Sequence, residues 1–97
     1  MRIVISPLGL EDLQEIVDYI ASDNPAAAHR LLEDLETFCT QTIVSNPNIG
    51  KPADELVPGL RVVTKRNYRI CYRVSGETIE IARFVHGARD LDALFSN

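Results

Sequence analysis

The chain has 97 residues, of which 45% are hydrophobic and 25% are charged, and its net charge is −4 at pH 7. This composition excludes intrinsic disorder and is typical of one globular domain, which we expect to span residues 1–97. No apolar run approaches the roughly 20 residues that a membrane-spanning helix needs, so no membrane partner is expected.

The N-terminus lacks the features of a secretion signal. Cys39 and Cys71 stand in apolar patterns without the spacing of metal ligands, which predicts two buried thiols rather than a disulfide or a metal site. These features fit a cytoplasmic protein. The P-loop, GxGxxG and HExxH motifs are missing, and we expect no cofactor.

The N-terminal half reads as a strand followed by two helices. Residues 2–5 are apolar, and Ser6-Pro7 then provides an N-cap and a proline in the first helical turn. The first helix has an apolar face and an acidic face. The apolar face comprises Leu10, Leu13, Ile16, Val17 and Ile20, and the acidic face comprises Glu11, Asp12, Glu15 and Asp18.

Asp23-Asn24-Pro25 predicts the end of this helix and the cap of the next one. Two helices joined by about three residues must form an antiparallel hairpin. His29 is interpreted as a surface residue. The apolar stripe of the second helix comprises Ala28, Leu31, Leu32, Leu35, Phe38, Cys39 and Ile43.

Residues 45–59 are rich in Asn, Pro and Gly and predict a loop. Strand patterns follow at 60–65, 68–74 and 78–86, and the tight turns between them indicate an antiparallel meander. Residues 89–95 can form one or two helical turns. The expected fold is α+β, in the order β-α-α-β-β-β, with an antiparallel helical hairpin packed on a small curved antiparallel sheet and a short C-terminal helix.

Charge is distributed unevenly. Residues 1–57 carry three Lys or Arg against ten Asp or Glu, whereas residues 58–97 carry seven against four. A basic face can recruit an anionic partner even when the whole chain is acidic, and guanidinium groups suit carboxylates and phosphates. Duplex DNA typically needs about six to ten phosphate contacts, so an acidic peptide or a structured RNA is the better match. The candidate binding residues are Arg61, Arg69, Arg73, Arg83 and Arg89.

The alternative is a solvated sheet face balanced by Glu77 and Glu80. His86 stands at a strand end, directly before a glycine and between Arg83 and Arg89. It is the one histidine in a position to transfer a proton, although a strand-end histidine is more often structural, hydrogen-bonded to backbone, than catalytic.

Four motifs together resemble the ParE branch of the RelE/ParE toxin superfamily. They are DLQEIVDYIASDNPAAA at residues 12–28, PGLR at 58–61, YRICYRV at 68–74 and HGARD at 86–90. The resemblance covers essentially the whole chain. It implies a toxin of a type II toxin–antitoxin module, with an α-hairpin on a curved antiparallel sheet, neutralised by a small ParD-like antitoxin that wraps around it.

The superfamily contains two activities. RelE-like members are ribosome-dependent mRNA endonucleases, and ParE-like members poison DNA gyrase. Arg69 and Arg89 match arginines of the nucleases, but Phe95 stands where the nucleases often have a tyrosine, which leaves only His86 for acid–base work. The resemblance therefore favours gyrase inhibition without catalytic residues.

An endoribonuclease that uses Arg69, His86 and Arg89 is the alternative, and a non-toxic interaction module is a further one. The resemblance also implies a role in plasmid stabilisation or stress response, with DNA contacted only through the antitoxin complex. The sequence leaves open which antitoxin binds, in what stoichiometry, and which surface meets the target.

Overall fold

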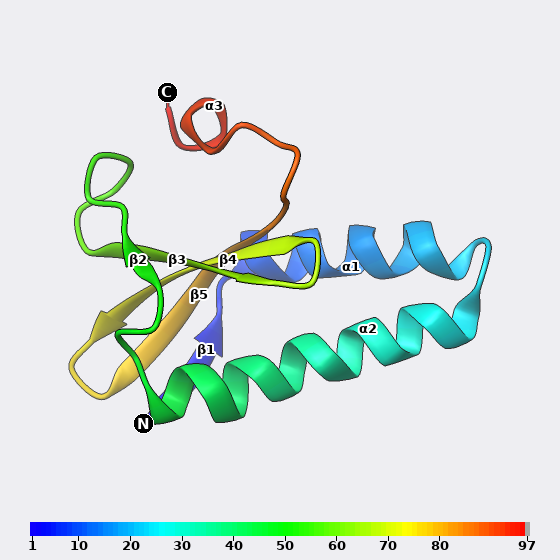
Figure 1. The fold of residues 1–97 in the computed structure, drawn as a ribbon, viewed down its shortest axis with the longest axis horizontal. Coiled ribbons are helices and arrows are strands. Elements are labelled where there is room, and N and C mark those ends of the chain that lie inside the picture. Colours follow the sequence, from blue (N-terminus) through cyan, green and yellow to red (C-terminus); the bar gives the residue numbers. More distant parts are fainter. Residues whose placement is uncertain (97) are drawn as a thin grey trace.

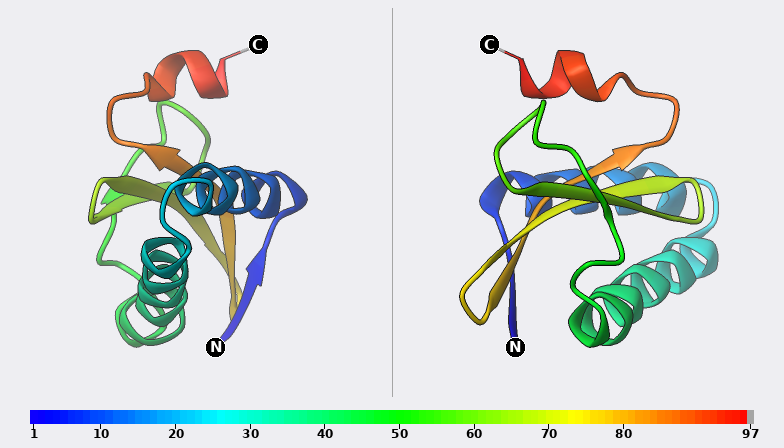
Figure 2. Two further views of the ribbon diagram at one scale, coloured as in Figure 1. Left: turned by 90° about the vertical axis from the view of Figure 1, so that its right-hand side faces the viewer. Right: turned by 60° about the vertical axis from the view of Figure 1, so that its left-hand side comes forward.

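The computed structural model describes residues 1–96, which form a five-stranded sheet of order β1-β5-β4-β3-β2 with helices on both sides (Figures 1 and 2). Helices α1 and α2 form the predicted hairpin, and α2 continues into the π-helical turns of η1. The elements are β1 (Arg2–Ile5), α1 (Pro7–Ala21), α2 (Pro25–Thr37), η1 (Phe38–Ile43), β2 (Lys51–Pro52), β3 (Leu60–Lys65), β4 (Tyr68–Ser75), β5 (Thr78–His86) and α3 (Leu91–Phe95).

The α+β fold and the β3-β4-β5 meander are confirmed, with two differences from the expected sheet. Strand β1 pairs in parallel with β5, so the sheet is mixed rather than wholly antiparallel. The predicted loop also contributes strand β2, which pairs with Arg61 and Val62 of β3. Within residues 1–96, no helix has the length and apolar character needed to cross a membrane.

Both predicted helix caps are present. The Ser6 hydroxyl accepts a hydrogen bond from the Gly9 amide at 3.0 Å and donates one to the carbonyl of Ala82 at 2.7 Å. The Asn24 side chain accepts from the Ala27 amide at 3.1 Å. A Cβ at Gly9 would lie 3.2 Å from the Ile81 carbonyl oxygen, so glycine lets α1 approach β5 closely. The first cap therefore also fixes α1 against the sheet.

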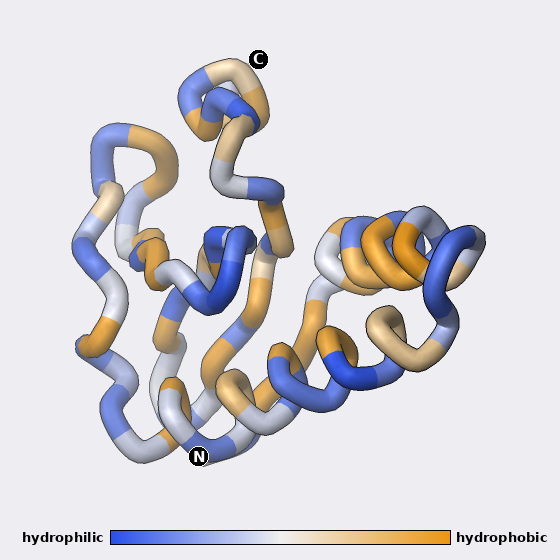
Figure 3. The backbone as a smooth tube through the Cα atoms, turned by 45° about the vertical axis from the view of Figure 1, so that its right-hand side comes forward, coloured by the Kyte–Doolittle hydropathy of each residue, from blue (hydrophilic) through white to orange (hydrophobic). Residues whose placement is uncertain are grey.

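The main core lies between the helical hairpin and the sheet. Hydrophobic and hydrophilic residues alternate along both helices and the strands, as expected for elements buried on one side (Figure 3). Leu35, near the C-terminal end of α2, is only 1% exposed. The buried cluster comprises Leu13, Leu31, Leu35, Cys39, Ile43, Ile70, Tyr72, Ile79, Ile81 and Phe84.

A second, smaller core lies on the opposite face of the sheet. Strand β4 alternates between the two, with Ile70 and Tyr72 in the main core and Cys71 in the second, as its sequence predicts. Helix α3 and the loop after β2 cover this face (Figure 2). The second core comprises Ala53, Leu60, Cys71 and Val85, with Leu56, Val57, Val62, Leu91, Leu94 and Phe95 packed against it.

Both cysteines are free and buried, as predicted. Burial raises the pKa of the Cys39 thiol to about 12 and the pKa of the Cys71 thiol to about 11. Since the thiolate is the reactive form, both side chains act as small apolar core residues near neutral pH.

The predicted apolar face of α1 is wrong at two positions. Leu10, expected in the core, is 54% exposed, while Asp12, expected on the acidic outer face, is buried at 8% exposure. The sheet edge beside α1 causes this rotation, because its polar groups bind the Asp12 carboxylate.

Replacing Leu35 with alanine should lower the free energy of unfolding by about 2–5 kcal/mol, because it leaves a cavity in the main core. Leu10→Ala is the matched control: it removes the same atoms from an exposed site and should change stability by no more than about 0.5 kcal/mol. Chemical denaturation of both variants measures the difference. Equal losses would show that the two leucines are buried alike, against the structure.

Candidate partner-binding groove

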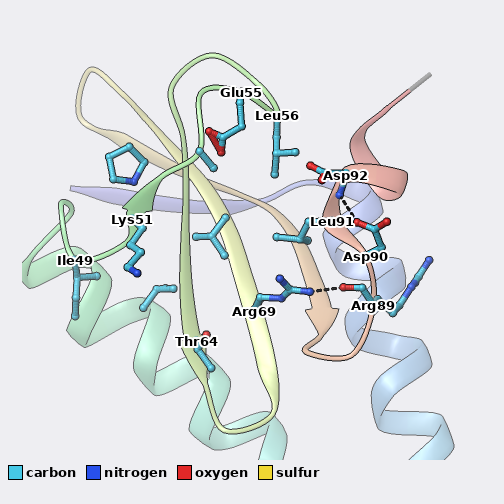
Figure 4. A pocket seen from close by; sticks show the side chains of 14 residues that line it. Ile49, Lys51, Glu55, Leu56, Thr64, Arg69, Arg89, Asp90, Leu91 and Asp92 are labelled. Carbon is cyan, nitrogen blue, oxygen red and sulfur yellow. Dashed lines mark hydrogen bonds between the residues drawn. The ribbon is translucent and has the colours of Figure 1, made fainter.

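A groove of about 700 Å³ lies on the second-core side of the sheet (Figure 4). We call it the C-terminal groove. Strands β3 and β4 form its floor, with Val62, Thr64 and Arg69. The segment around β2 forms one wall and the chain leading into α3 forms the other. The walls comprise Ile49, Lys51, Pro52, Ala53, Glu55 and Leu56 on one side and Arg89, Asp90, Leu91 and Asp92 on the other.

Arg69 fastens the second wall to the floor. Its guanidinium donates from Nη2 to the main-chain carbonyls of Gly87, at 3.2 Å, and Arg89. Figure 4 shows this side chain pointing along the groove floor to the Arg89 carbonyl, whereas the Arg89 side chain points away. Two backbone acceptors therefore hold the Nη2 end of the Arg69 guanidinium. Its buried Nε atom has no acceptor within residues 1–96.

His86 shapes the turn that follows β5. Its Nδ1 accepts a hydrogen bond from the Ala88 amide at 3.1 Å, and its ring meets Tyr68 edge-on with the centroids 5.6 Å apart. The histidine lines a smaller hollow of about 560 Å³ that it shares with Arg69. One ring nitrogen is therefore already used by the backbone. His29, by contrast, lies on the surface as predicted, paired with Glu33.

The other three candidate arginines also have internal partners. Arg61 donates to the carbonyls of Gly50, at 2.7 Å, and Asn48. Arg73 forms an ion pair with Glu80 at 3.3 Å. Glu80 is one of the two acids that the sequence analysis named as balancing the sheet face. Of the five predicted binding residues, Arg69 and Arg89 line the same hollow, the C-terminal groove.

Arg83 belongs to an ion pair that the sequence analysis missed. Its Nε and Nη2 donate to the two carboxylate oxygens of Asp12 at 2.7 and 2.8 Å, and the Phe84 amide donates to the same carboxylate at 3.0 Å. The hydrogen bond that Arg83 donates to Asp12 raises the pKa of Arg83. No local pattern signals this contact, because its partners lie 71 and 72 residues further along the chain.

A bulge in β5 produces this geometry. Cys71 is opposite Arg83 and Tyr72 is opposite Ile81, so Ala82 is the extra residue. The bulge lies where β1 ends and α1 begins, and the Ala82 carbonyl accepts from Ser6. Beyond the last residue of β1, the Asp12 carboxylate therefore provides the hydrogen-bond acceptor for the edge of β5.

A tyrosine ties the predicted loop to the sheet. The buried Tyr72 hydroxyl accepts from the Gly50 amide at 2.9 Å and donates to the Pro47 carbonyl at 2.7 Å. A Cβ at Gly50 would lie 2.9 Å from the Tyr72 ring, so only glycine fits. This contact places the residues before β2 at the rim of the C-terminal groove.

Phe95, the residue at the position of the nuclease tyrosine, is partly buried and packs against the second core. It helps to hold α3 on the sheet. In this position its ring provides apolar contact and has no group that exchanges a proton.

Comparisons with known proteins agree with this architecture. Residues 3–91 match the family model described as ParE toxin of type II toxin–antitoxin system, parDE. Toxin ParE1 of Mycobacterium tuberculosis is 32% identical over 93 residues, covering 94% of both chains. Toxin ParE3 of Caulobacter vibrioides is 34% identical over 47 residues, or 48% of this chain.

Among solved structures, a chain of the chromosomal ParDE system from P. aeruginosa superposes with a TM-score of 0.72 at 27% identity, covering 89% of this chain and 95% of that one. A chain of the toxin–antitoxin complex RelBE2 from Mycobacterium tuberculosis shares the fold with a TM-score of 0.65 at 20% identity, covering 88% and 95%.

A helical hairpin on this mixed sheet, with a short C-terminal helix across its other face, defines a small toxin of the RelE/ParE fold. Within that class, the match over residues 3–91 and the 32% identity to Toxin ParE1 are decisive. The chain belongs to the ParE toxin family of type II toxin–antitoxin systems.

Replacing Arg69 with glutamine should release the segment from Gly87 to Asp90, because the shorter amide cannot reach both carbonyls. The lost charge-assisted hydrogen bonds should destabilise this segment by about 1.5 kcal/mol. Hydrogen exchange at the amides of residues 89–94 should therefore become about tenfold faster. Arg73→Gln is the control, since it removes an exposed arginine of the same strand. Unchanged exchange in Arg69→Gln would mean that α3 is held by apolar packing alone.

Proposed function

We propose that this ParE-family toxin inhibits DNA gyrase and is neutralised by a cognate ParD-like antitoxin. The observation that carries the proposal is the state of the three residues that a nuclease would use. Arg69 is bound to two backbone carbonyls, His86 accepts from the Ala88 amide, and Arg89 turns its carbonyl rather than its side chain towards Arg69.

Cleavage of RNA requires a group that takes the 2′-hydroxyl proton and donors aimed at the phosphate. Here Nη2 of Arg69 is already bound to backbone carbonyls, and Nδ1 of His86 is already bound to the turn. Phe95 cannot exchange a proton. This arrangement supports a toxin that acts by binding a target protein, which is the mode that the ParE branch of the resemblance implies.

The C-terminal groove supports the antitoxin part of the proposal. Its lining offers apolar side chains such as Val62, Leu56 and Leu91. Charged groups of both signs stand beside them: Lys51 and Arg89, with Glu55, Asp90 and Asp92. These features suit a helix or strand with apolar anchors flanked by charged residues of both signs. The solved relatives from P. aeruginosa and M. tuberculosis are described as toxin–antitoxin systems, which supports the same arrangement here.

Induction of the chain without an antitoxin should give filamentous cells and a DNA-damage response while transcripts stay intact at first. Co-expression of the adjacent gene product should restore growth and yield a co-purifying complex. Ribosome-dependent transcript cleavage before any DNA damage would move the chain to the endonuclease alternative. A chain that is harmless on induction and finds no partner would support the plain interaction module.

His86→Gln separates binding from proton transfer. Glutamine can still accept from the Ala88 amide but cannot act as an acid–base group, so the variant should remain toxic at a similar induction level. A nuclease should lose about 10²-fold or more of its activity. Binding of the antitoxin controls for folding, and a folded, antitoxin-binding variant without toxicity would contradict the proposal.

A further inference from the structure

The two hairpin turns of the meander share a backbone geometry but differ in the residue that adopts it. Strands β3 and β4 are joined by Arg66-Asn67, and strands β4 and β5 are joined by Gly76-Glu77. The first residue of each turn has a positive φ, 56° at Arg66 and 60° at Gly76. Glycine adopts this left-handed conformation at little cost, whereas an arginine there is strained. Among residues 1–96, Arg66 is the one residue other than glycine with a positive φ, so its turn needs a contact that holds it.

The side chain of Arg66 makes a contact of this kind. Its Nε and Nη2 both donate to Oδ2 of Asp34 in α2, and the bond from Nε is 2.9 Å long. The neighbouring Lys65 places its Nζ over the Phe38 ring, 5.5 Å from the ring centroid. A glycine at position 66 would relax the backbone but could not reach α2. The ion pair therefore offsets the strain that the arginine introduces.

The same turn holds the segment that follows β5. The carbonyl of Asn67 accepts a hydrogen bond from the Gly87 amide at 2.8 Å. The carbonyl of Gly87 accepts from Arg69, on the floor of the C-terminal groove. Gly87 is therefore attached through its amide to the turn and through its carbonyl to the sheet. Two residues further on, Arg89 begins one wall of the groove.

These contacts connect the two sides of the sheet. Helix α2, which carries Asp34, packs on the main core, and the groove wall leads into α3 on the opposite side (Figure 1). The side chains of Arg66 and Asp34 are 46 and 45% exposed, so dissolved ions and charged groups of other molecules can reach the pair. A cation that competes for the Asp34 carboxylate can therefore break the connection from the side of the sheet that lies away from the groove.

We propose that the ion pair between Arg66 and Asp34 is a latch that keeps the wall of the C-terminal groove in place. In the latched state Arg66 is held in its left-handed conformation and the Asn67 carbonyl binds the Gly87 amide. When a cation takes the Asp34 carboxylate, Arg66 returns to a relaxed φ, the Asn67 carbonyl turns away, and the groove wall loosens. A cationic partner of α2 thereby alters the groove on the opposite side of the sheet. The inference does not depend on which target the toxin acts on.

Hydrogen exchange of the Gly87 amide, followed by NMR, reports the state of the latch. Arg66→Ala keeps the strain and removes the ion pair, whereas Arg66→Gly removes both. Exchange should become at least about fivefold faster in Arg66→Ala. It should stay within about twofold of the native rate in Arg66→Gly, because a glycine turn needs no latch. Equal rates in the two variants would overturn the proposal.

Asp34→Ala tests the other half of the pair. It should accelerate Gly87 exchange as much as Arg66→Ala does, and it should have no effect when combined with Arg66→Gly. Glu33→Ala is the matched control, because Glu33 is the adjacent acid of α2 and pairs with His29 rather than with the turn. The latch is refuted if Asp34→Ala leaves the exchange unchanged, or if Glu33→Ala accelerates it equally.

Sodium chloride tests the response to competing ions. At about 1 M salt the native chain should reach the Gly87 exchange rate of Asp34→Ala, while Arg66→Gly should not respond. The amides of Arg89 and Leu94, which donate to carbonyls of the same segment, should accelerate together with Gly87. Acceleration confined to Gly87 would show that the latch does not reach the groove wall, against the proposal.

Discussion

The carboxylate of Asp12 joins helix α1 to strand β5, and the position of the helical hairpin depends on this contact. It accepts from the guanidinium of Arg83 and from the amide of Phe84, and it lies in the first half of α1. Strand β1 ends too early to cover this part of β5, so without Asp12 the Phe84 amide would be buried and unpaired. Removing one partner of a buried pair typically costs about 3–5 kcal/mol, which makes this contact one of the strongest constraints on the helical hairpin.

Two other arginines, like Arg83, also attach one segment of the chain to the sheet. Arg61 holds the segment before β2, Arg69 holds the segment before α3, and Arg83 holds α1. Positive charge that looks like a binding surface in the sequence is thus largely used to attach peripheral segments to a small sheet. This arrangement supports the proposal that the toxin acts by binding a target protein.

Much of the fold could be predicted from sequence because it follows from local signals. Ser6-Pro7 and Asn24-Pro25 begin the helices, and the period-two pattern of β4 assigns its residues to two cores. The burial of Asp12, the exposure of Leu10 and the parallel β1–β5 pairing depend on long-range contacts with a bulge at Ala82, and no local pattern encodes these. For the candidate site, the sequence singled out the arginines and His86, but their hydrogen-bond partners within the fold could not be predicted from it.

The most direct measurement uses purified components: the chain, DNA gyrase and supercoiled plasmid in one reaction, and the chain, ribosomes and messenger RNA in another. The account predicts linear DNA trapped with gyrase, suppressed by the antitoxin, and intact RNA. Cleaved RNA together with unaffected gyrase would contradict it, and would require Arg69 and His86 to leave the backbone partners that they have here.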